Sequence, residues 1–428
     1  MRRGFKSVNV MMVALLVLMT AACGDGASKD SRVKNVIVMV PDGFSAAYAT
    51  NYRNYIGGQA STLDEILVGM AKTRSLDHFI TDSAAAASAM ATGNKVQNGA
   101  ISMTADGKAL KTVLEGAIEA NKATGMVVTS TLSHATPGAF SSHANSRVQE
   151  LEIAAQLIGK VDVLLGGGKN LYSPEDKKRA EELGYLYLEN RDQLLEANHD
   201  KLFGLFAGES MTPEIDRDAM TEPSLEEMTN KALEVLAPNK NGFFLLVEGS
   251  QIDYAGHVND AAWAMREIEA FERAVKSALE FAKENGDTLL IIAGDHDTGG
   301  MTVGNVDSSY SIDLLHHVKA SGAAMIDYWK RQGQDLKEVV HEYAQVELND
   351  DEIRAIEESH YYEATLNQII SDRAGIIWIT LYHTGVDVPV YAYGPGSSKL
   401  FGVIDNTDIA KVIAQSIGFD LESAEGVE

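Results

Sequence analysis

Short, continuous apolar runs alternate with helical patterns along most of this 428-residue chain. Runs of this kind are typical of strands that are buried on both faces of a parallel sheet. The patterns between them predict helices that cover the sheet. The predicted strands are 36–40, 126–129, 161–165, 243–247, 288–293, 376–381 and 388–393, and the predicted helices are 110–121, 146–159, 224–236, 261–284 and 408–417. We therefore expect an α/β fold, with one large domain built on a mostly parallel central sheet with helices on both faces.

Two stretches interrupt this alternation and are predicted as insertions within a domain that spans 33–428. Residues 171–222 are polar and weakly periodic. Residues 304–373 contain a charged helical part at 336–358, and they separate two predicted strands that should be neighbours. We therefore expect the second stretch to form a cap or a dimer contact near the rim of the site. A passive surface insertion is an equal alternative.

The N-terminus has the pattern of an export signal over residues 1–22. Three basic residues stand in the first six positions, and the apolar run 8–19 that follows is too short to span a bilayer. Small residues then precede Cys23, as in a bacterial lipoprotein cleavage box, although Thr20 stands where that box prefers Leu. Residues 23–32 read as a flexible tether. We expect an exported protein, either periplasmic or anchored to the membrane through a lipid on Cys23, with simple secretion as the alternative.

The charge of the chain narrows the choice of partners. Its formal net charge is −25, with a sequence pI near 4.8. A nucleic-acid backbone is therefore not an expected partner, because proteins that bind it carry basic patches. An anionic ligand would need local cations, either metal ions or a buried arginine. Cys23 is the only cysteine, so no disulfide can form within the chain.

The stretch 80–95 carries the first candidate for chemistry. Asp82 and Ser83 stand directly before an alanine-rich run. This order places Ser83 on the first turn of a helix, where unpaired backbone N–H groups and the helix dipole favour a phosphate. The alternative is an ordinary capped helix that packs in the core.

Acidic and imidazole side chains follow the ends of several predicted strands, where sites form in open α/β sheets. Asp253 and His257 are four residues apart, so they share one face of a helix. Further candidates at strand ends are Asp42, Asp295, His296 and His383. This set suits Zn2+, which binds histidine nitrogen and carboxylate oxygen without needing cysteine. Each histidine alone would more often be a structural residue.

Oxygen donors and one arginine complete the set of candidates. Glu248 and Thr136 lie at strand ends and, with Asp42, offer the hard ligands that Mg2+ prefers. The alternatives are an ion pair for Glu248 and a turn cap for Thr136. Arg147 stands at a predicted helix start, where its planar guanidinium can bind two phosphate oxygens. A surface arginine is the alternative.

Taken together, these residues resemble the alkaline phosphatase family, and the resemblance covers 36–417. It is loosest at 171–222 and 304–373. The motifs that carry it, in the order in which they occur in the family, are Val40-Pro41-Asp42-Gly43, Thr81-Asp82-Ser83-Ala84-Ala85, Thr92-Gly93-Asn94-Lys95, His134-Ala135-Thr136-Pro137, Asp162 to Gly168, Val247-Glu248-Gly249, Asp253 to His257, Asp295-His296 and His383-Thr384-Gly385.

The resemblance implies a role for each matching residue. Ser83 would be the nucleophile and Arg147 the phosphate clamp, with Asp82 orienting the arginine. One zinc site would be formed by Asp253, His257 and His383, the second by Asp42, Asp295 and His296 with Ser83, and the magnesium site by Asp42, Thr136 and Glu248.

Two positions depart from part of the family. His134 stands where some bacterial members have Asp, so it is expected to loosen magnesium binding, with zinc coordination as an alternative. Tyr254 stands where others have Lys, His or Trp near the phosphate. Since a tyrosine brings no charge, we expect phosphate to bind less tightly and to leave faster.

The resulting hypothesis is a metal-dependent phosphate monoester hydrolase that works through a phosphoserine on Ser83, with two zinc ions and one magnesium ion. Its partners would be small phosphate monoesters and, in one interpretation, a second copy of the chain. Nucleic acid is expected only as an end phosphate, and a membrane only through the signal or lipid anchor. A related two-metal phosphodiesterase or sulfatase is the first alternative. A non-catalytic lipoprotein that binds metal or phosphate is the second.

Overall fold

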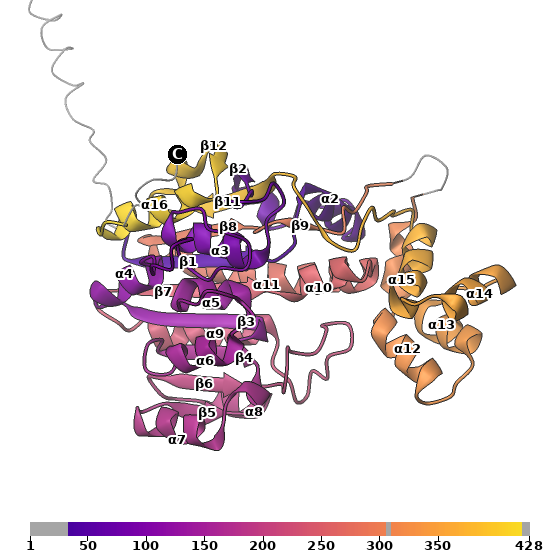
Figure 1. The fold of residues 1–428 in the computed structure, drawn as a ribbon, viewed down its shortest axis with the longest axis horizontal. Coiled ribbons are helices and arrows are strands. Elements are labelled where there is room, and N and C mark those ends of the chain that lie inside the picture. The colour runs from indigo at the N-terminus through magenta and orange to yellow at the C-terminus, as the bar shows by residue number, and fades with distance from the viewer. Residues whose placement is uncertain (1–32, 305–309, 422–428) are drawn as a thin grey trace, which may run out of the picture. The chain divides into compact units, whose positions relative to one another are not determined.

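The computed structural model describes residues 33–304 and 310–421, and its core is one central sheet (Figure 1). Among the described residues, all strands of this sheet run parallel except β11, which is antiparallel to both of its neighbours. The predicted mostly parallel sheet is therefore confirmed. In order across the sheet, the ten strands are β12 (Gly402–Asp405), β2 (Leu67–Lys72), β11 (Val388–Tyr393), β8 (Thr288–Ala293), β1 (Asn35–Pro41), β7 (Phe243–Gly249), β3 (Ala123–Thr131), β4 (Val163–Gly167), β6 (Leu202–Leu205) and β5 (Leu186–Leu188).

Helices cover both faces of the sheet because successive side chains of a strand point to opposite sides. In β1, Ile37 and Met39 pack into one core, and Val36, Val38 and Val40 pack into the other. Helices of the first core are α2 (Ala46–Tyr55), α9 (Leu225–Leu236) and α11 (Ala261–Asn285). Helices of the second are α3 (Ser83–Thr92), α4 (Val113–Glu119), α5 (Ala135–Ser141), α6 (Glu150–Leu157) and α16 (Thr407–Ile417). The prediction of a sheet buried on both faces is confirmed.

The prediction of a strand at 376–381 is wrong. This segment runs as irregular backbone whose hydrogen bonds go to a neighbouring loop: Thr302 N donates to Ile377 O at 2.9 Å, and Ile379 N donates to Gly299 O at 3.0 Å. The place beside β8 is already filled by β11. The apolar run in the sequence reflects the burial of Ile376 and Trp378 rather than a strand.

His383 therefore does not follow a strand of the large sheet. It lies in β10 (His383–Thr384), which pairs antiparallel with β9 (Asp297–Thr298) in a separate two-stranded sheet. The helix predicted from 146 begins only at Glu150, so Arg147 lies in the turn before α6 rather than on the helix.

The segment 171–222, which the sequence predicts as an insertion, supplies the edge of the central sheet. Its strands β5 and β6 are only three and four residues long, which is too short to give a periodic signal. Its helices are α7 (Pro174–Glu182) and α8 (Arg191–Glu196), and η2 (Lys169–Leu171) ends at its first residue.

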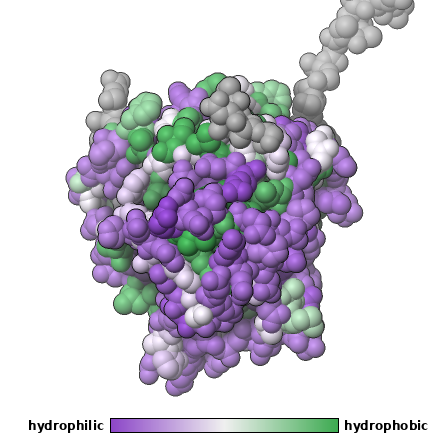
Figure 2. All heavy atoms as spheres, turned by 90° about the vertical axis from the view of Figure 1, so that its right-hand side faces the viewer, coloured by the Kyte–Doolittle hydropathy of each residue, from purple (hydrophilic) through white to green (hydrophobic). Residues whose placement is uncertain are grey.

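The segment 304–373 contains the helices that Figure 1 shows gathered at one end of the domain, beyond α10 (Gln251–His257). We call these helices the helical group. Figure 2 looks onto this end, where the surface is mostly hydrophilic with a few hydrophobic patches. The group consists of η3 (Ile312–His317), α12 (Gly322–Lys330), α13 (Leu336–Ala344), α14 (Asp350–Glu358) and α15 (Tyr362–Arg373), and the remaining short helices of the domain are η1 (Leu63–Ile66) and η4 (Ser397–Leu400).

The predicted export signal at 1–22 and the tether at 23–32, with Cys23, lie outside the described residues. Within the described part of the chain, no helix has the length and apolar character needed to cross a membrane.

Candidate active site

The candidate residues converge because β8, β1, β7 and β3 are consecutive in the sheet and parallel. Their carboxyl ends therefore meet at one edge, as in other open α/β sites. Asp42 follows β1, and Asp295 follows β8. After β7 the chain enters α10 with Asp253, and after β3 it enters α5 with Thr136.

Ser83 is the first residue of α3, and its side chain is buried, with the residue 1% exposed. The preceding Asp82 caps the helix: its Oδ1 accepts a hydrogen bond from the Ala85 backbone N–H at 3.0 Å. The Ser83 Oγ lies 3.1 Å from Nε2 of His296. The candidate nucleophile therefore lies at a helix N-terminus and within hydrogen-bond distance of His296, one of the candidate metal ligands.

The side chain of Asp82, the residue before Ser83, also binds Arg147. Its Nη1 donates to Oδ2 of Asp82 at 3.1 Å, and its backbone N–H donates to Gly99 O at 2.7 Å. Its Nη2 lies 3.2 Å from Nε2 of His134. Since a guanidinium can only donate, Nε2 of His134 is the acceptor. Asp82 therefore caps the helix of Ser83 with one oxygen and holds the arginine with the other.

One candidate metal group is formed by Asp253, His257 and His383. Nε2 of His257 lies 3.3 Å from Asp253 Oδ2 and 3.2 Å from Nε2 of His383. The other ring nitrogens face backbone carbonyls: His257 Nδ1 donates to Leu381 O at 2.7 Å, and His383 Nδ1 donates to Thr81 O at 2.9 Å. These bonds fix the tautomers and leave both Nε2 atoms free to bind a metal ion.

A second group is formed by Asp42, Asp295 and His296, whose ligand atoms lie within 4.8 Å of one another. All three side chains are fully buried. Neither carboxylate oxygen of Asp42 has a hydrogen-bond partner among the described residues. Burial, together with the nearby Asp295 carboxylate, raises the pKa of Asp42 well above its usual value. The ligand atoms of Asp253, His296 and His383 also lie within 4.8 Å of one another, so the first and second groups are continuous.

A third group is formed by Asp42, His134 and Glu248, with Thr136 nearby in sequence. Within the described chain, Nδ1 of His134, Oγ1 of Thr136 and Oε1 of Glu248 are buried without a hydrogen-bond partner. Burial raises the pKa of Glu248 to about 7. Burial, and then the Arg147 charge, lowers the pKa of His134 to about 4. His134 is therefore neutral near pH 7.

These observations test whether the residues fit metal ions. Burying unpaired carboxylates costs several kcal/mol each unless a cation compensates them. Both carboxylate oxygens of Asp42 and Oε1 of Glu248 have no hydrogen-bond donor among the described residues, and the nearest imidazole recorded for Asp42 is that of His296, with Nε2 3.6 Å from Oδ1. The first two groups mix carboxylate and imidazole, as zinc sites do, while the third offers oxygen ligands of the kind Mg2+ prefers. The residues present fit the metals.

Several polar partners of the site were not predicted from the sequence. Thr298 donates its hydroxyl to Oδ1 of Asp253, and Ser130 donates to Oε2 of Glu248 at 3.2 Å. The Ser210 hydroxyl lies 3.3 Å from that of Tyr254, whose ring packs edge-to-face on His134 at 5.8 Å. Thr298 could have been found because it continues the polar run after Asp295. Ser210 gave no signal, since it lies in the weakly periodic stretch.

The structure explains why the motif at 40–43 ends in a glycine, Gly43. It has a φ of +75°, and a Cβ there would lie 2.8 Å from Cα of Asp253 and 2.9 Å from Oγ1 of Thr298. A side chain would therefore push the loop of Asp42 away from α10. The glycine lets the ligands that follow β1 and β7 approach each other.

The fold and the site together define a class of hydrolase that acts on phosphate esters at the carboxyl edge of an α/β sheet. Comparison with known proteins agrees, because the family model described as "Alkaline phosphatase" matches residues 33–419. The chain belongs to the alkaline phosphatase family. The sequence-based prediction of the family and of a phosphomonoesterase is thereby confirmed.

Individual relatives support the same assignment. Alkaline phosphatase 4 of Bacillus subtilis is 39% identical over 90% of this chain and 88% of its own length. Among solved structures, the cold-active enzyme of Shewanella sp. has a TM-score of 0.84 at 34% identity and covers 90% of this chain and 99% of its own. The Thermus thermophilus enzyme has a TM-score of 0.85 at 30% identity, covering 91% and 93%.

Proposed function

We propose that the chain hydrolyses phosphate monoesters through a phosphoserine intermediate on Ser83. The observation that carries the proposal is the arrangement around Asp82, which places a buried serine and the Arg147 guanidinium at one helix N-terminus. The guanidinium offers a fork of donors for two phosphate oxygens. The backbone N–H groups at the start of α3 add to the positive field that a phosphoryl group meets there.

The chain's own residues then divide the work. The Ser83 oxygen attacks phosphorus, the bond to the ester oxygen breaks, and the alcohol leaves with that oxygen. Arg147 holds the phosphoryl oxygens in line throughout, while Asp82 keeps the guanidinium in place. Water attacks the phosphoserine in the second half, releasing inorganic phosphate and restoring the Ser83 hydroxyl.

We assign the metal ligands as the sequence predicts them. Asp253, His257 and His383 would hold one zinc ion, and Asp42, Asp295 and His296 with Ser83 would hold the other. Magnesium would be held by Asp42, Thr136 and Glu248. When bound, these cations lower the pKa of the hydroxyl groups that they contact and neutralise charge on the reacting phosphoryl group.

His134 is proposed to weaken magnesium binding in the third group. The TAB5 enzyme of an Antarctic bacterium, with a TM-score of 0.70 and 28% identity to this chain, was solved as variants in which Glu or Asp replaces a histidine, with Mg bound in a site named M3. His134 lies within the third group and brings no negative charge. An acidic residue there would add an anionic ligand or neighbour for a hard cation.

A Ser83→Ala variant tests the mechanism. It should lose at least about 10^3-fold in kcat/KM on an aryl phosphate and should yield no acid-stable phosphoserine after rapid quenching. Ser88→Ala is the matched control, because Ser88 lies on the same helix and bonds to backbone groups of Ala100 and Ser102 instead of the site. Activity that survives both Ser83→Ala and a chelator would defeat the proposal. Parallel assays with bis-aryl phosphate and aryl sulfate exclude or establish the related hydrolases.

Export through residues 1–22 and a lipid on Cys23 remain part of the proposal, supported by the sequence pattern alone. Labelled palmitate should enter the wild-type protein in a bacterial host and should not enter Cys23→Ala. A homodimer is the proposed assembly, and light scattering of the mature chain would test it.

A further inference from the structure

A cavity of about 470 Å3 adjoins the candidate site at His257. Its lining includes residues of the helical group and of the turn that leads into α15, among them Ile326, Tyr361 and Tyr362. The lining also includes His257 and Tyr382, the residue before His383. The hydrolytic groups described above use only His257 from this lining. The cavity therefore needs a separate explanation.

A row of side chains leads from the nucleophile to this cavity. Ser83 contacts His296, whose ring stacks on that of His383 at 3.5 Å between centroids, and His383 in turn contacts His257 at 3.2 Å. The exposed fraction of the imidazoles rises along the row, from 0% at His296 to 13% at His383 and 36% at His257. The serine lies at the closed end of the site and the cavity lies at the open end.

The direction of the reaction places the alcohol at the open end. In an in-line displacement the attacking and leaving oxygens lie on opposite sides of phosphorus. If Ser83 attacks from the closed end, the ester oxygen departs near His257, and the group attached to it extends into the cavity. This step rests on the proposed function of Ser83.

We propose that the cavity is a subsite for the alcohol part of the phosphate ester and that it favours uncharged aromatic alcohols over anionic ones.

Aromatic and aliphatic walls give the subsite its preference. Tyr361 and Tyr382 are 69% and 73% exposed, so their rings are available to pack on an aromatic group. Tyr362 is held in place by Trp329, which packs edge-to-face on it at 5.6 Å. Ile326 adds an apolar side chain from α12. A planar aromatic alcohol would find more contact area here than a small aliphatic one.

Glu363 gives the subsite its discrimination by charge. Burial, with the nearby Asp260 and Asp216, raises the pKa of Glu363 to about 7, so it is ionised at pH 8 and above. Among the described residues that line the cavity, Glu363 is the one carboxylate and no lysine or arginine is present; Lys330 is outside the lining, with its Nζ 4.2 Å from the centroid of the Tyr362 ring. An anionic alcohol would therefore be repelled, while a neutral one would not.

The walls are fixed relative to the site, as a selective subsite requires. The helical group is tied to the loop after α10: Gly322 N donates to Asp260 Oδ2 at 2.9 Å, and Asn367 Nδ2 donates to Val258 O at 2.9 Å. Ser371 also donates its hydroxyl to Asn259 O at 3.1 Å. These bonds hold the helical group against the loop that directly follows His257.

The experiment compares kcat/KM for methyl phosphate, 2-naphthyl phosphate and 4-carboxyphenyl phosphate at pH 8.5 on the metal-loaded enzyme. The value of kcat/KM is chosen because it reports the steps up to departure of the alcohol. Tyr361→Ala should lower kcat/KM for the naphthyl ester by roughly 3- to 10-fold, which is the value of one aromatic contact. Methyl phosphate and inhibition by inorganic phosphate should change less than about 2-fold, since neither reaches Tyr361.

Tyr343→Ala is the matched control. Tyr343 belongs to α13 of the same helical group and stacks on Tyr328 at 4.8 Å, outside the cavity lining. It should leave all three esters unchanged. A second variant, Glu363→Gln, should raise kcat/KM for the carboxyphenyl ester by about 3-fold or more relative to the naphthyl ester, because it removes the repelling charge.

Equal effects of Tyr361→Ala on all esters, or none on the naphthyl ester, would overturn the subsite. So would a Glu363→Gln variant with an unchanged ratio of carboxyphenyl to naphthyl ester. These failures differ from failure of the proposed function, in which the wild-type enzyme would hydrolyse none of the three esters or Ser83→Ala would remain active.

Discussion

The sheet edge and the helical group contribute to the candidate site in different ways. The sheet edge supplies buried ligands such as Asp42 and His296, whose positions follow from strands that are neighbours in the sheet. The helical group contributes to the site through the wall of a cavity and through hydrogen bonds to the loop after α10. We infer that the edge carries the reaction common to the family, whereas the helical group tunes which ester enters.

Removing a ligand shared by two metal groups should have the largest effect at the sheet edge. Asp42 belongs to both the second and the third group, so Asp42→Asn removes one charged ligand from each. We expect kcat/KM to fall by about 10^3-fold or more, since the loss amounts to several kcal/mol of charge stabilisation. Steady-state assays with 2-naphthyl phosphate and metal analysis by mass spectrometry would measure it.

The same substitution should have the opposite effect on the metal-free protein. There, Asp42 is a buried carboxylate close to Asp295, and its pKa is raised. Asp42→Asn removes this repulsion, so the Tm of the chelated variant should exceed that of the chelated wild type, while the order reverses with metals present. A Tm difference of the same sign and size with and without metals would contradict the assignment of Asp42 as a metal ligand.

The difference between the two regions also decides how much could be predicted from the sequence. Edge residues such as Asp295 and His296 directly follow long, buried strands, so their convergence follows from the strand pattern alone. Tyr361 lies beyond four helices of the helical group, and nothing in its local sequence indicates a contact with His257. The strands β5 and β6 were also not predicted, because they are too short to show a hydrophobic period in the sequence.

One prediction at the edge was missed for a different physical reason. The stretch 376–381 predicts a strand because it is a continuous apolar run, whereas in the structure buried residues alternate there with more exposed ones. Burial of Trp378 under Gly299, rather than pairing in the sheet, explains that alternation: a Cβ on Gly299 would lie 2.5 Å from the Trp378 ring. The hydrophobic pattern of a sequence indicates which residues are buried. It does not indicate which backbone groups pair, because that depends on the three-dimensional packing.

Separating the two roles of Asp82 should give the next largest effect. Asp82→Asn keeps an oxygen that can cap α3, because asparagine is also a good N-cap, but it removes the charge that holds Arg147. We expect kcat/KM to fall by roughly 10- to 100-fold, with the Tm shifted by only a few degrees. Arg147→Lys, which loses the planar fork, is the comparison variant and should show a loss of similar size. A collapse of Tm in Asp82→Asn would show that capping, rather than orientation, is the main role.

Changing the charge at position 254 should have a smaller, measurable effect. Tyr254 lies beside His134 and brings no charge to the site. Tyr254→Lys adds a cation near the phosphate region, so the inhibition constant for inorganic phosphate should fall by roughly 3- to 10-fold. Tyr254→Phe is the control, since it removes the hydroxyl near Ser210 without adding charge. Unchanged inhibition in Tyr254→Lys would remove Tyr254 from the phosphate surroundings.

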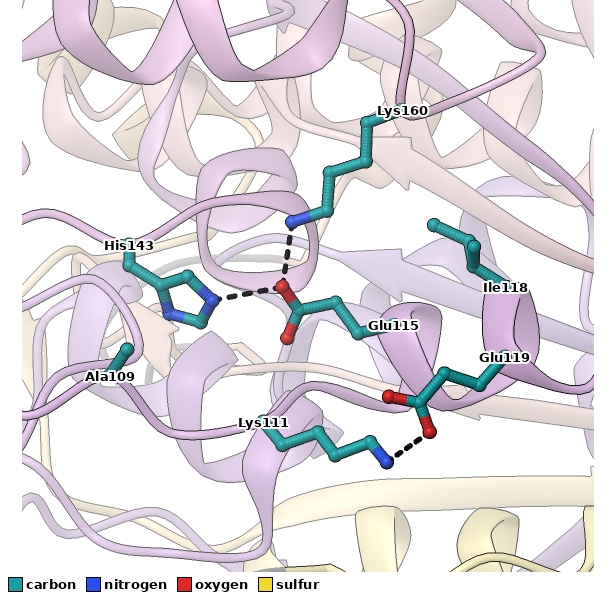
Figure 3. Close-up of a pocket in the computed structure, with 7 residues that line it drawn as sticks. All are labelled: Ala109, Lys111, Glu115, Ile118, Glu119, His143 and Lys160. Atoms are coloured by element: carbon teal, nitrogen blue, oxygen red, sulfur yellow. Dashed lines mark hydrogen bonds and ion pairs between the residues drawn. The ribbon is translucent and has the colours of Figure 1, made fainter.

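The smallest effect is expected far from the metal groups, in the cluster shown in Figure 3, where Glu115 lies between His143 and Lys160. Although partial burial opposes its charge, these partners lower the pKa of Glu115 from its ordinary value of 4.5 to about 2. A lowered carboxyl pKa stabilises the fold above the unfolded-state value, and this stability is lost as the pH falls from about 4.5 towards 2.

Glu115→Gln isolates this charge, because glutamine can still accept from Thr112 N in the capping box. Urea unfolding of the chelated protein should show the variant about 1 kcal/mol less stable at pH 7 and nearly equal to wild type at pH 2. Glu119→Gln, which breaks the more exposed pair with Lys111, should show a smaller difference at both values. A Glu115→Gln difference that persists unchanged at pH 2 would show that packing, rather than charge, is what this cluster contributes.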